Sequence, residues 1–160
     1  MAALFDQYPN PLLDLREVTA AYLEPLLYEE TEEWRTELDW DYRPSADLVR
    51  RFVDMRALTG FALPGEKEAA GYGYYVCEDG KGLIGGLYLG RRYRTLEHEN
   101  TLLTAILDAM WRTPGMPLAQ ISTLNPGGSL RFASGMSESG VTVFFAAWGA
   151  SVDCACASRQ

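Results

Sequence analysis

The sequence predicts one mixed α/β (α+β) domain over residues 1–160. A length of 160 residues with 48% hydrophobic residues suits one sizeable core and is too short for two. Two apolar runs, 69–77 and 82–90, flank Asp79-Gly80, a dipeptide typical of a tight hairpin. Apolar residues recur at helical spacing before and after this hairpin. The run 82–90 is almost entirely apolar, so we expect a central strand in a mixed sheet with helices on both faces.

The first strand and the first helix are predicted upstream of the hairpin. Residues 12–19 alternate apolar and charged side chains imperfectly, which favours a strand. Thr19 is then placed to cap a helix whose apolar face runs from Leu23 to Leu38. The rest of this helix is acidic, and we interpret it first as a solvated face and only second as a partner surface. Its acids are Glu29, Glu30, Glu32, Glu33 and Glu37.

A second helix is predicted from Ser45, which we expect to be its N-cap, up to Gly60, which we expect to end it. Asp47 lies in its first turn, where the helix dipole favours a negative charge. Residues 60–65 then favour a short strand. The buried stripe of this helix is expected to comprise Leu48, Val49, Phe52 and Val53.

A third helix and several shorter elements follow the hairpin. Apolar residues at helical spacing run from Leu96 through Trp111, and a Thr-Pro-Gly sequence ends the helix. Residues 117–124 favour another strand. Residues 129–136 favour a short helix, and residues 141–156 favour two last strands.

Composition argues against several classes of partner. The net charge of −8 argues against nucleic acid, whose phosphates are held by an excess of Lys and Arg. The longest apolar run, 141–152, is shorter than a membrane span, and residues 1–11 lack the basic start of a secretory signal. We therefore expect no membrane partner. Three cysteines are an odd set for a disulfide framework and indicate a reducing, cytoplasmic setting.

The last part of the chain differs in composition from the rest. Residues 119–160 carry two acidic and two basic side chains and are rich in Ser, Gly and Ala. Two explanations stay open. This atypical, neutral part has a role of its own, or it comes from an altered reading frame and the product folds poorly.

Known catalytic and metal-binding motifs are missing. His98 is the sole histidine, which excludes any site that needs two, and we expect it to be a plain surface residue. Cys154 and Cys156 lack a second ligand pair, so no metal site is predicted. The Gly-rich stretches match neither a dinucleotide fingerprint nor a P-loop, and Ser137 does not stand in a nucleophile elbow.

The aromatic residues allow two interpretations. Trp34 and Trp40 flank residues 35–39, and residues 40–44 link the first two helices. This region indicates either a substrate-recognition loop or an aromatic staple that holds the helices together. Tyr72, Tyr74 and Tyr75 alternate along a strand, which is more typical of core or edge packing than of a binding cleft.

The turn between the central strand and the third helix combines Arg91, Arg92 and Arg94 with Glu97 and Glu99. Free backbone amides at a helix N-terminus are a natural seat for an anion. The arginines would support such a site, whereas the two glutamates would repel the anion.

At this turn the chain resembles the GCN5-related N-acetyltransferase (GNAT) family. The match rests on residues 86–111, GLYLGRRYRTLEHENTLLTAILDAMW, whose counterpart in that family is a strand, an Arg- or Gln-led Gly-rich turn and a helix. A second match is ISTLNPGGSLRFASGM at 121–136, similar to the family's strand, Asn, short helix and Gly-aromatic ending. The order of elements from Leu12 onward agrees as well. The resemblance implies an acyl-CoA N-acyltransferase-like fold.

The resemblance also implies acetyl-CoA as the co-substrate. The backbone of Leu87, Tyr88 and Leu89 would bind the acetyl group and the pantetheine arm. Asn125 would lie near the pantetheine, and Phe132 occupies the position of the family's proton-donating tyrosine. The turn that would wrap the pyrophosphate comprises Arg94, Thr95, Leu96, Glu97, His98 and Glu99.

The implied function is transfer of an acetyl group to a small-molecule or peptide amine by direct attack, without a covalent enzyme intermediate. Glu78, or a water held by a strand residue, would take the proton of the amine. Acids near the first helices would favour a cationic amine, although plain solvated charge is an equally good interpretation of them. These acids are Glu33, Glu37, Asp39 and Asp41.

Two departures from the family pattern support an alternative function. Glu97 and Glu99 stand at the two glycine positions of the turn, where a side chain blocks close approach of a phosphate. Phe132 lacks a hydroxyl and cannot serve as a general acid. The alternative is a catalytically inactive GNAT-like binding or regulatory module that self-associates, for instance as a homodimer.

Overall fold

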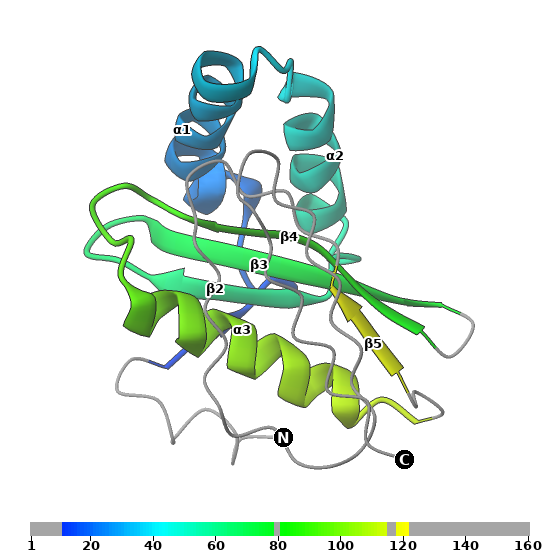
Figure 1. The fold of residues 1–160 in the computed structure, drawn as a ribbon. Helices are drawn as coiled ribbons and strands as arrows, with labels where there is room; N and C mark the ends of the chain where they lie inside the picture. The colour runs from blue at the N-terminus through cyan, green and yellow to red at the C-terminus, as the bar shows by residue number, and fades with distance from the viewer. Residues whose placement is uncertain (1–10, 79–80, 115–117, 122–160) are drawn as a thin grey trace, which may run out of the picture.

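The computed structural model describes residues 11–78, 81–114 and 118–121, which form a mixed sheet with helices on both faces. The strands are β1 (Leu13–Asp14), β2 (Gly60–Pro64), β3 (Ala69–Glu78), β4 (Lys81–Leu89) and β5 (Leu118–Ile121). The helices are α1 (Ala20–Leu38), α2 (Arg43–Asp54) and α3 (Leu96–Trp111). The sheet order is β1-β2-β3-β4-β5, antiparallel up to β4, with β5 parallel to β4. Figure 1 shows α1 and α2 on one face of the sheet and α3 on the other. The predicted fold class is confirmed.

The hairpin and the third helix lie where the sequence predicts them. Glu78 pairs with Lys81, so β3 and β4 are joined by the two residues of the Asp-Gly dipeptide. The α3 helix runs from Leu96 to Trp111, as expected from its apolar spacing. Side chains of β3 and β4 alternate between two cores, as a period of two requires. Tyr72 and Tyr88 lie in the core under α1 and α2, whereas Ile84, Leu87 and Leu89 lie in the core under α3.

The first strand and its helix cap differ from the prediction. The strand is only Leu13–Asp14, because β1 contacts β2 over two residue pairs alone. Thr19 is the N-cap of α1, as expected, but its side chain makes no capping hydrogen bond. The Ala20 amide donates instead to Asp54 Oδ1 at 3.1 Å. The end of α2 therefore supplies the acceptor for the start of α1, a long-range contact that no local pattern reports.

The second helix starts earlier and faces differently than predicted. It begins at Arg43, with Tyr42 as the N-cap, so Ser45 lies inside the helix and is not its cap. Pro44 fits the first turn, where a missing N–H costs nothing. The buried stripe is Ala46, Val49 and Val53, whereas Leu48 and Phe52 are 51% and 42% exposed. The predicted buried stripe is displaced around the helix by about one residue, because the small Ala46 was not counted as a core residue.

Gly60 begins β2 and does not end the second helix, which stops at Asp54. Arg56 has a φ of 56°, and this left-handed residue turns the chain towards the sheet. A Cβ at Gly60 would collide with the carbonyl oxygen of Gly73 on β3. Position 60 therefore needs glycine, because any side chain would keep β2 from pairing closely with β3.

No helix among the described residues is long and apolar enough to cross a membrane. The short helix at 129–136 and the two strands at 141–156 lie outside the described residues. The same holds for Asn125, Phe132, Ser137, Cys154 and Cys156.

Candidate functional site

The β4 strand carries a bulge at its middle. Tyr74 pairs with Gly86 and Tyr75 pairs with Ile84, so Gly85 is an extra residue on β4. The ring of Tyr74 lies across this bulge: a Cβ on Gly85 would collide with it, and one on Gly86 would lie 2.8 Å from its Cε1. Only glycine therefore lets the tyrosine cover the bulge.

The same point marks a change in how β4 is paired. Its residues Lys81–Ile84 pair with Leu118–Ile121 of β5. From Gly85 to Leu89, no described strand lies on the β5 side of β4. A sheet edge without a strand partner can bind an extended ligand through its backbone N–H and C=O groups.

This stretch of β4 leads to the N-terminus of α3. Thr95 caps this helix, since its Oγ1 accepts from the His98 amide at 3.2 Å, and its carbonyl accepts from the Glu99 amide at 3.0 Å. The amides of Leu96 and Glu97 have no acceptor among the described residues. Two N–H groups at the positive end of a 16-residue helix are therefore available to an anion.

Arg94 is directed away from those amides and towards α1. Its guanidinium donates to both carboxylate oxygens of Glu33 at 2.8 Å, and to the Leu89 carbonyl at 3.1 Å. It also lies over the Tyr88 ring, 5.4 Å from the centroid. Burial would raise the pKa of Glu33, but hydrogen bonds from Arg94 and Tyr88 and the Arg94 charge hold it below its usual value. Arg94 therefore connects the β4–α3 turn to α1, and its charge is already balanced by the Glu33 carboxylate.

Glu29 supplies a carboxylate to the same turn. Its Oε1 accepts from the Arg91 amide at 2.6 Å and from the Tyr88 hydroxyl at 3.2 Å. One turn amide is thus satisfied by a carboxylate of the protein itself, upstream of the free amides of Leu96 and Glu97. An anion that approached the Arg91 amide would be repelled by this carboxylate.

A second buried carboxyl, that of Glu30, lies one helical turn before Glu33. Tyr72 Oη donates to its Oε2 at 2.6 Å, and Trp34 Nε1 donates to its Oε1 at 3.4 Å. Burial raises the pKa of Glu30 to about 7 in spite of these donors. The acidic face of α1 is therefore not wholly solvated as predicted, since Glu30 and Glu33 are each 4% exposed. The structure packs them against the tyrosines of β3 and β4.

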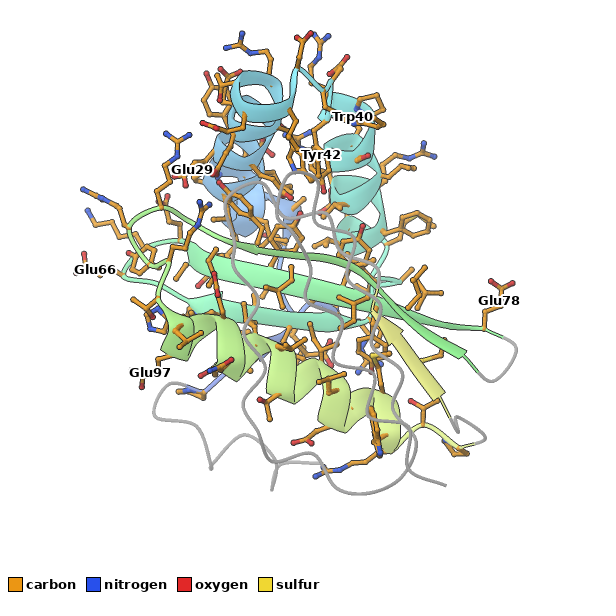
Figure 2. The ribbon with its side chains drawn as sticks, viewed as in Figure 1. Glu29, Trp40, Tyr42, Glu66, Glu78 and Glu97 are labelled. Atoms are coloured by element: carbon orange, nitrogen blue, oxygen red, sulfur yellow. The ribbon has the colours of Figure 1, made fainter. Side chains whose placement is uncertain are left out.

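The aromatic residues between α1 and α2 have separate roles. Trp34 stacks on Tyr42 with 5.3 Å between the ring centroids, which agrees with the staple interpretation. Trp40 is 59% exposed and lies at the end of the helix pair (Figure 2).

The other residues predicted for the pyrophosphate turn are spread around the start of α3. His98 Nδ1 lies 2.7 Å from the Tyr93 carbonyl oxygen, so this ring packs on the turn and is not a plain surface residue. Glu97 is exposed and borders a shallow hollow on α3 with Asn100 and Thr101. Glu99 is 7% exposed, and its burial raises its pKa while the charge of Arg94 opposes the rise.

Glu78 lies far from the bulge. It pairs with Lys81 at the tip of the hairpin, five residues beyond Gly73, the partner of Leu87. Five residues of strand span roughly 17 Å. Figure 2 shows Glu78 and Glu97 at opposite ends of the sheet. The structure therefore does not bring Glu78 together with Leu87, Tyr88 and Leu89.

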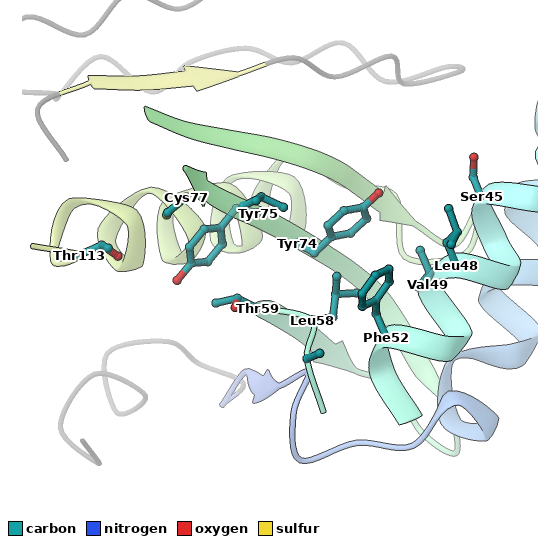
Figure 3. A pocket seen from close by; sticks show the side chains of 12 residues that line it. Ser45, Leu48, Val49, Phe52, Leu58, Thr59, Tyr74, Tyr75, Cys77 and Thr113 are labelled. Atoms are coloured by element: carbon teal, nitrogen blue, oxygen red, sulfur yellow. The ribbon is translucent and has the colours of Figure 1, made fainter. Parts of the chain in front are cut away.

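A cleft of about 630 Å³ opens between α2 and the end of β3 (Figure 3). No local sequence pattern indicates this cleft, because the strand and the helix that form it are separated in the chain. Its walls include Leu48 and Phe52, which were assigned to the core, and Tyr74, the residue over the β4 bulge. No group of three or more metal-ligating side chains is found in the part of the chain that the structure describes.

Comparison with solved structures identifies proteins of similar fold. A possible acetyltransferase from Clostridium difficile 630 matches with a TM-score of 0.51 and 10% identity, over 82% of this chain and 97% of that chain. The PaiA N-acetyltransferase from Thermoplasma acidophilum, solved in complex with coenzyme A, matches with a TM-score of 0.44 and 14% identity, over 66% and 74%. No protein-family profile and no curated protein sequence matches the chain. The first of these likenesses shows the fold.

Proposed function

We propose that the protein is an N-acetyltransferase that moves an acetyl group from acetyl-CoA to an amine by direct attack. One observation carries the proposal: the edge of β4 that lacks a described partner, Gly85 to Leu89, leads from a bulge to two amides at the start of α3 that have no acceptor among the described residues. An extended chain ending in phosphates fits such a path. The fold shared with a possible acetyltransferase supports it.

Each part of the cofactor would meet a group of matching chemistry. The pantetheine amides would hydrogen-bond the backbone edge of β4 near Leu87 and Leu89, as an added strand does. The pyrophosphate would bind the amides of Leu96 and Glu97. Asn125 and Phe132 remain predictions for the pantetheine contact and for the position of the family's acid.

The chemical step needs positioning more than acid or base strength. The amine nitrogen attacks the thioester carbonyl carbon, a C–N bond forms, the C–S bond breaks, and the leaving thiolate takes up a proton. Holding the two reactants together supplies much of the rate. A water on the β4 edge is a better candidate than Glu78 to receive the amine proton, because Glu78 is at the far end of the hairpin.

The N-terminus of α3 can be tested by removing one N–H. Leu96 is the first residue of the helix, where proline is tolerated, and Thr95 before it is already extended (φ −125°, ψ 153°). Leu96→Pro should weaken acetyl-CoA binding by about tenfold or more, because a hydrogen bond to a charged group is lost. Leu96→Ala, which keeps the N–H, should bind as the wild type does. Calorimetric titration of both variants measures the difference.

The outcomes separate the two functions considered for this fold. Heat of binding in the wild type that is lost only in Leu96→Pro supports the cofactor site. No heat and no thermal shift with millimolar acetyl-CoA would exclude the transferase and leave the non-catalytic, self-associating module.

A further inference from the structure

The cleft beside α2 arises where β3 continues beyond its partner strand. β2 begins at Gly60, which pairs with Tyr74, and the Tyr75 amide still donates to the Thr59 carbonyl at 2.9 Å. From Val76 to Glu78 no described strand lies on this side of β3. The open space between this free edge and α2 measures about 630 Å³, within the range of small-molecule sites.

The walls of the cleft are apolar and aromatic. Leu48 and Phe52 project from α2, and Leu58 and Val76 contribute from the other side. These large apolar side chains are not all buried: Leu48 and Val76 are 51% and 48% exposed, and Phe52 is 42% exposed. Apolar surface gathered in a concave site favours a ligand that covers it.

None of the described residues that line the cleft carries a formally charged side chain. The polar groups there are the hydroxyls of Ser45, Thr59, Tyr74, Tyr75 and Thr113 and the thiol of Cys77. Burial, and next the nearby Glu30 carboxyl, raise the pKa of Tyr74, so its hydroxyl stays protonated at neutral pH. The described lining gives a cation no counter-ion, and Glu30, the carboxyl that acts on Tyr74, is buried with its pKa raised to about 7. The cleft therefore suits a neutral ligand that accepts hydrogen bonds or packs on rings.

The cleft shares Tyr74 with the β4 bulge, where the proposed path of the cofactor begins. Tyr74 lines it, and the ring of the same residue covers the Gly85–Gly86 bulge of β4. The ring is held in place by stacking on Tyr72, with 6.4 Å between centroids and 9° between planes. Figure 3 shows Tyr74 between the α2 side chains and the strand. A ligand packed against Phe52 in this cleft can thus contact the Tyr74 ring that covers the bulge.

We infer that this cleft binds the acceptor and that the acceptor is a weakly basic aromatic amine, uncharged at pH 7. The inference rests on the proposed function and adds the substrate class. A neutral amine is also the form that attacks a thioester, so no proton needs to be removed before the reaction. The acids expected to attract a cationic amine are absent from the lining. Glu33 is bound to Arg94, and Asp41 is bound to Arg43 at 2.8 Å.

Two isomeric probes test the charge of the acceptor. 4-Ethylaniline and 2-phenylethylamine contain the same atoms, but the first is neutral at pH 7 and the second is a cation. In calorimetry without acetyl-CoA, we expect 4-ethylaniline to bind at least tenfold more tightly than 2-phenylethylamine or spermidine. Equal or tighter binding of either cation overturns the inference.

Two matched variants test the location. Phe52→Ala should weaken 4-ethylaniline binding by about tenfold through lost aromatic contact. Met55→Ala removes a more exposed residue of the same helix end, 68% exposed and outside the cleft, and should leave binding unchanged. Because Phe52 and Met55 are both exposed, we expect both variants to fold, and thermal unfolding of each variant tests this expectation. Unchanged binding in a folded Phe52→Ala variant excludes this cleft.

The proposed acceptor class and the proposed acetyltransferase activity can be refuted independently of each other. A protein that binds acetyl-CoA and acetylates spermidine but not 4-ethylaniline refutes the acceptor class and keeps the transferase. A protein that binds 4-ethylaniline through Phe52 but does not bind acetyl-CoA refutes the transferase and keeps the cleft as a ligand site.

Discussion

Two buried carboxylates lie three residues apart on α1, and each accepts a hydrogen bond from a tyrosine of the sheet, yet their pKa values shift in opposite directions. Glu30 accepts from Tyr72 at 2.6 Å, and Glu33 accepts from Tyr88 at 2.7 Å. The two tyrosines face each other directly across β3 and β4. Yet the pKa of Glu30 is raised to about 7, whereas that of Glu33 is lowered. Two things differ: Glu30 lies deeper in the protein, and Arg94 reaches Glu33 only.

The comparison teaches that a tyrosine hydroxyl alone does not compensate for burying a carboxylate. Burial disfavours the charged form of both groups, and the neutral donors around Glu30 leave it with a raised pKa. A bidentate guanidinium reverses the balance at Glu33. The ionised pair of Glu33 and Arg94 connects the β4–α3 turn to α1. Glu30, with its raised pKa, lies deeper, between α1 and the sheet.

The largest expected effect comes from removing Arg94. Arg94→Ala leaves the Glu33 carboxylate buried without its counter-ion, and such losses cost about 3 kcal/mol. The side chain of Arg94 is 20% exposed, so we expect the free energy of unfolding to fall by roughly 2–3 kcal/mol in urea at pH 7. Arg91→Ala is the control, since Arg91 is 59% exposed and lies 3.9 Å from Glu33. Equal losses in the two variants would contradict the assignment.

The next effect is a pH dependence of opposite sign at the two carboxyls. The folded pKa of Glu30 lies above its unfolded value, so its contribution to stability is complete below about pH 4.5 and is lost as the pH rises through 7. Glu30→Gln removes the titrating carboxyl, so the stability of this variant has no such loss as the pH rises. Relative to the wild type, the variant should therefore gain roughly 2 kcal/mol in free energy of unfolding between pH 5 and pH 8, the range spanned by the raised pKa.

Glu33→Gln should respond in the other direction. The folded pKa of Glu33 is lowered, so its contribution is complete above the unfolded pKa and is lost as the pH falls through the folded value. The deficit of this variant relative to the wild type should shrink on acidification. Urea unfolding of both variants across the pH range measures the two trends, and parallel trends would refute the comparison.

The smallest effect is expected from the tyrosine hydroxyls. Tyr72→Phe removes the hydroxyl that donates to Glu30 at 2.6 Å, and it should cost about 1 kcal/mol at pH 8, where the carboxylate is charged. Tyr88→Phe should cost less, because Glu33 keeps both hydrogen bonds from Arg94. Thermal unfolding of the two variants at pH 8 gives the difference, and the reverse order would show that Arg94 does not dominate at Glu33.

Local sequence signals predicted the fold well. The hairpin and α3 were located correctly, because turn chemistry and apolar spacing act over a few residues. A signal for the buried acids was present too: Glu30 and Glu33 follow Leu23 and Leu26 by seven residues each, on the same helical face. Charge alone suggested a solvated face, since carboxylates are seldom buried unless they have a partner.

The partners of these residues could not be predicted. Arg94 was expected to face a pyrophosphate, but it binds Glu33 on a helix 61 residues away in the chain. Glu78 was expected near the chemistry, but strand register places it at the hairpin tip. The acetyl-CoA contacts of Leu87, Leu89, Asn125 and Phe132 remain predictions.

The sequence by itself determined the elements and their alternation, because hairpin turns, helix caps and apolar periods depend on neighbouring residues. Tertiary structure alone decided which carboxylates are buried, where Arg94 points and that a cleft opens beside Phe52. These depend on which strands pair, in which register, and where one ends before its neighbour. Such distances between segments far apart in the chain leave no trace in any local pattern.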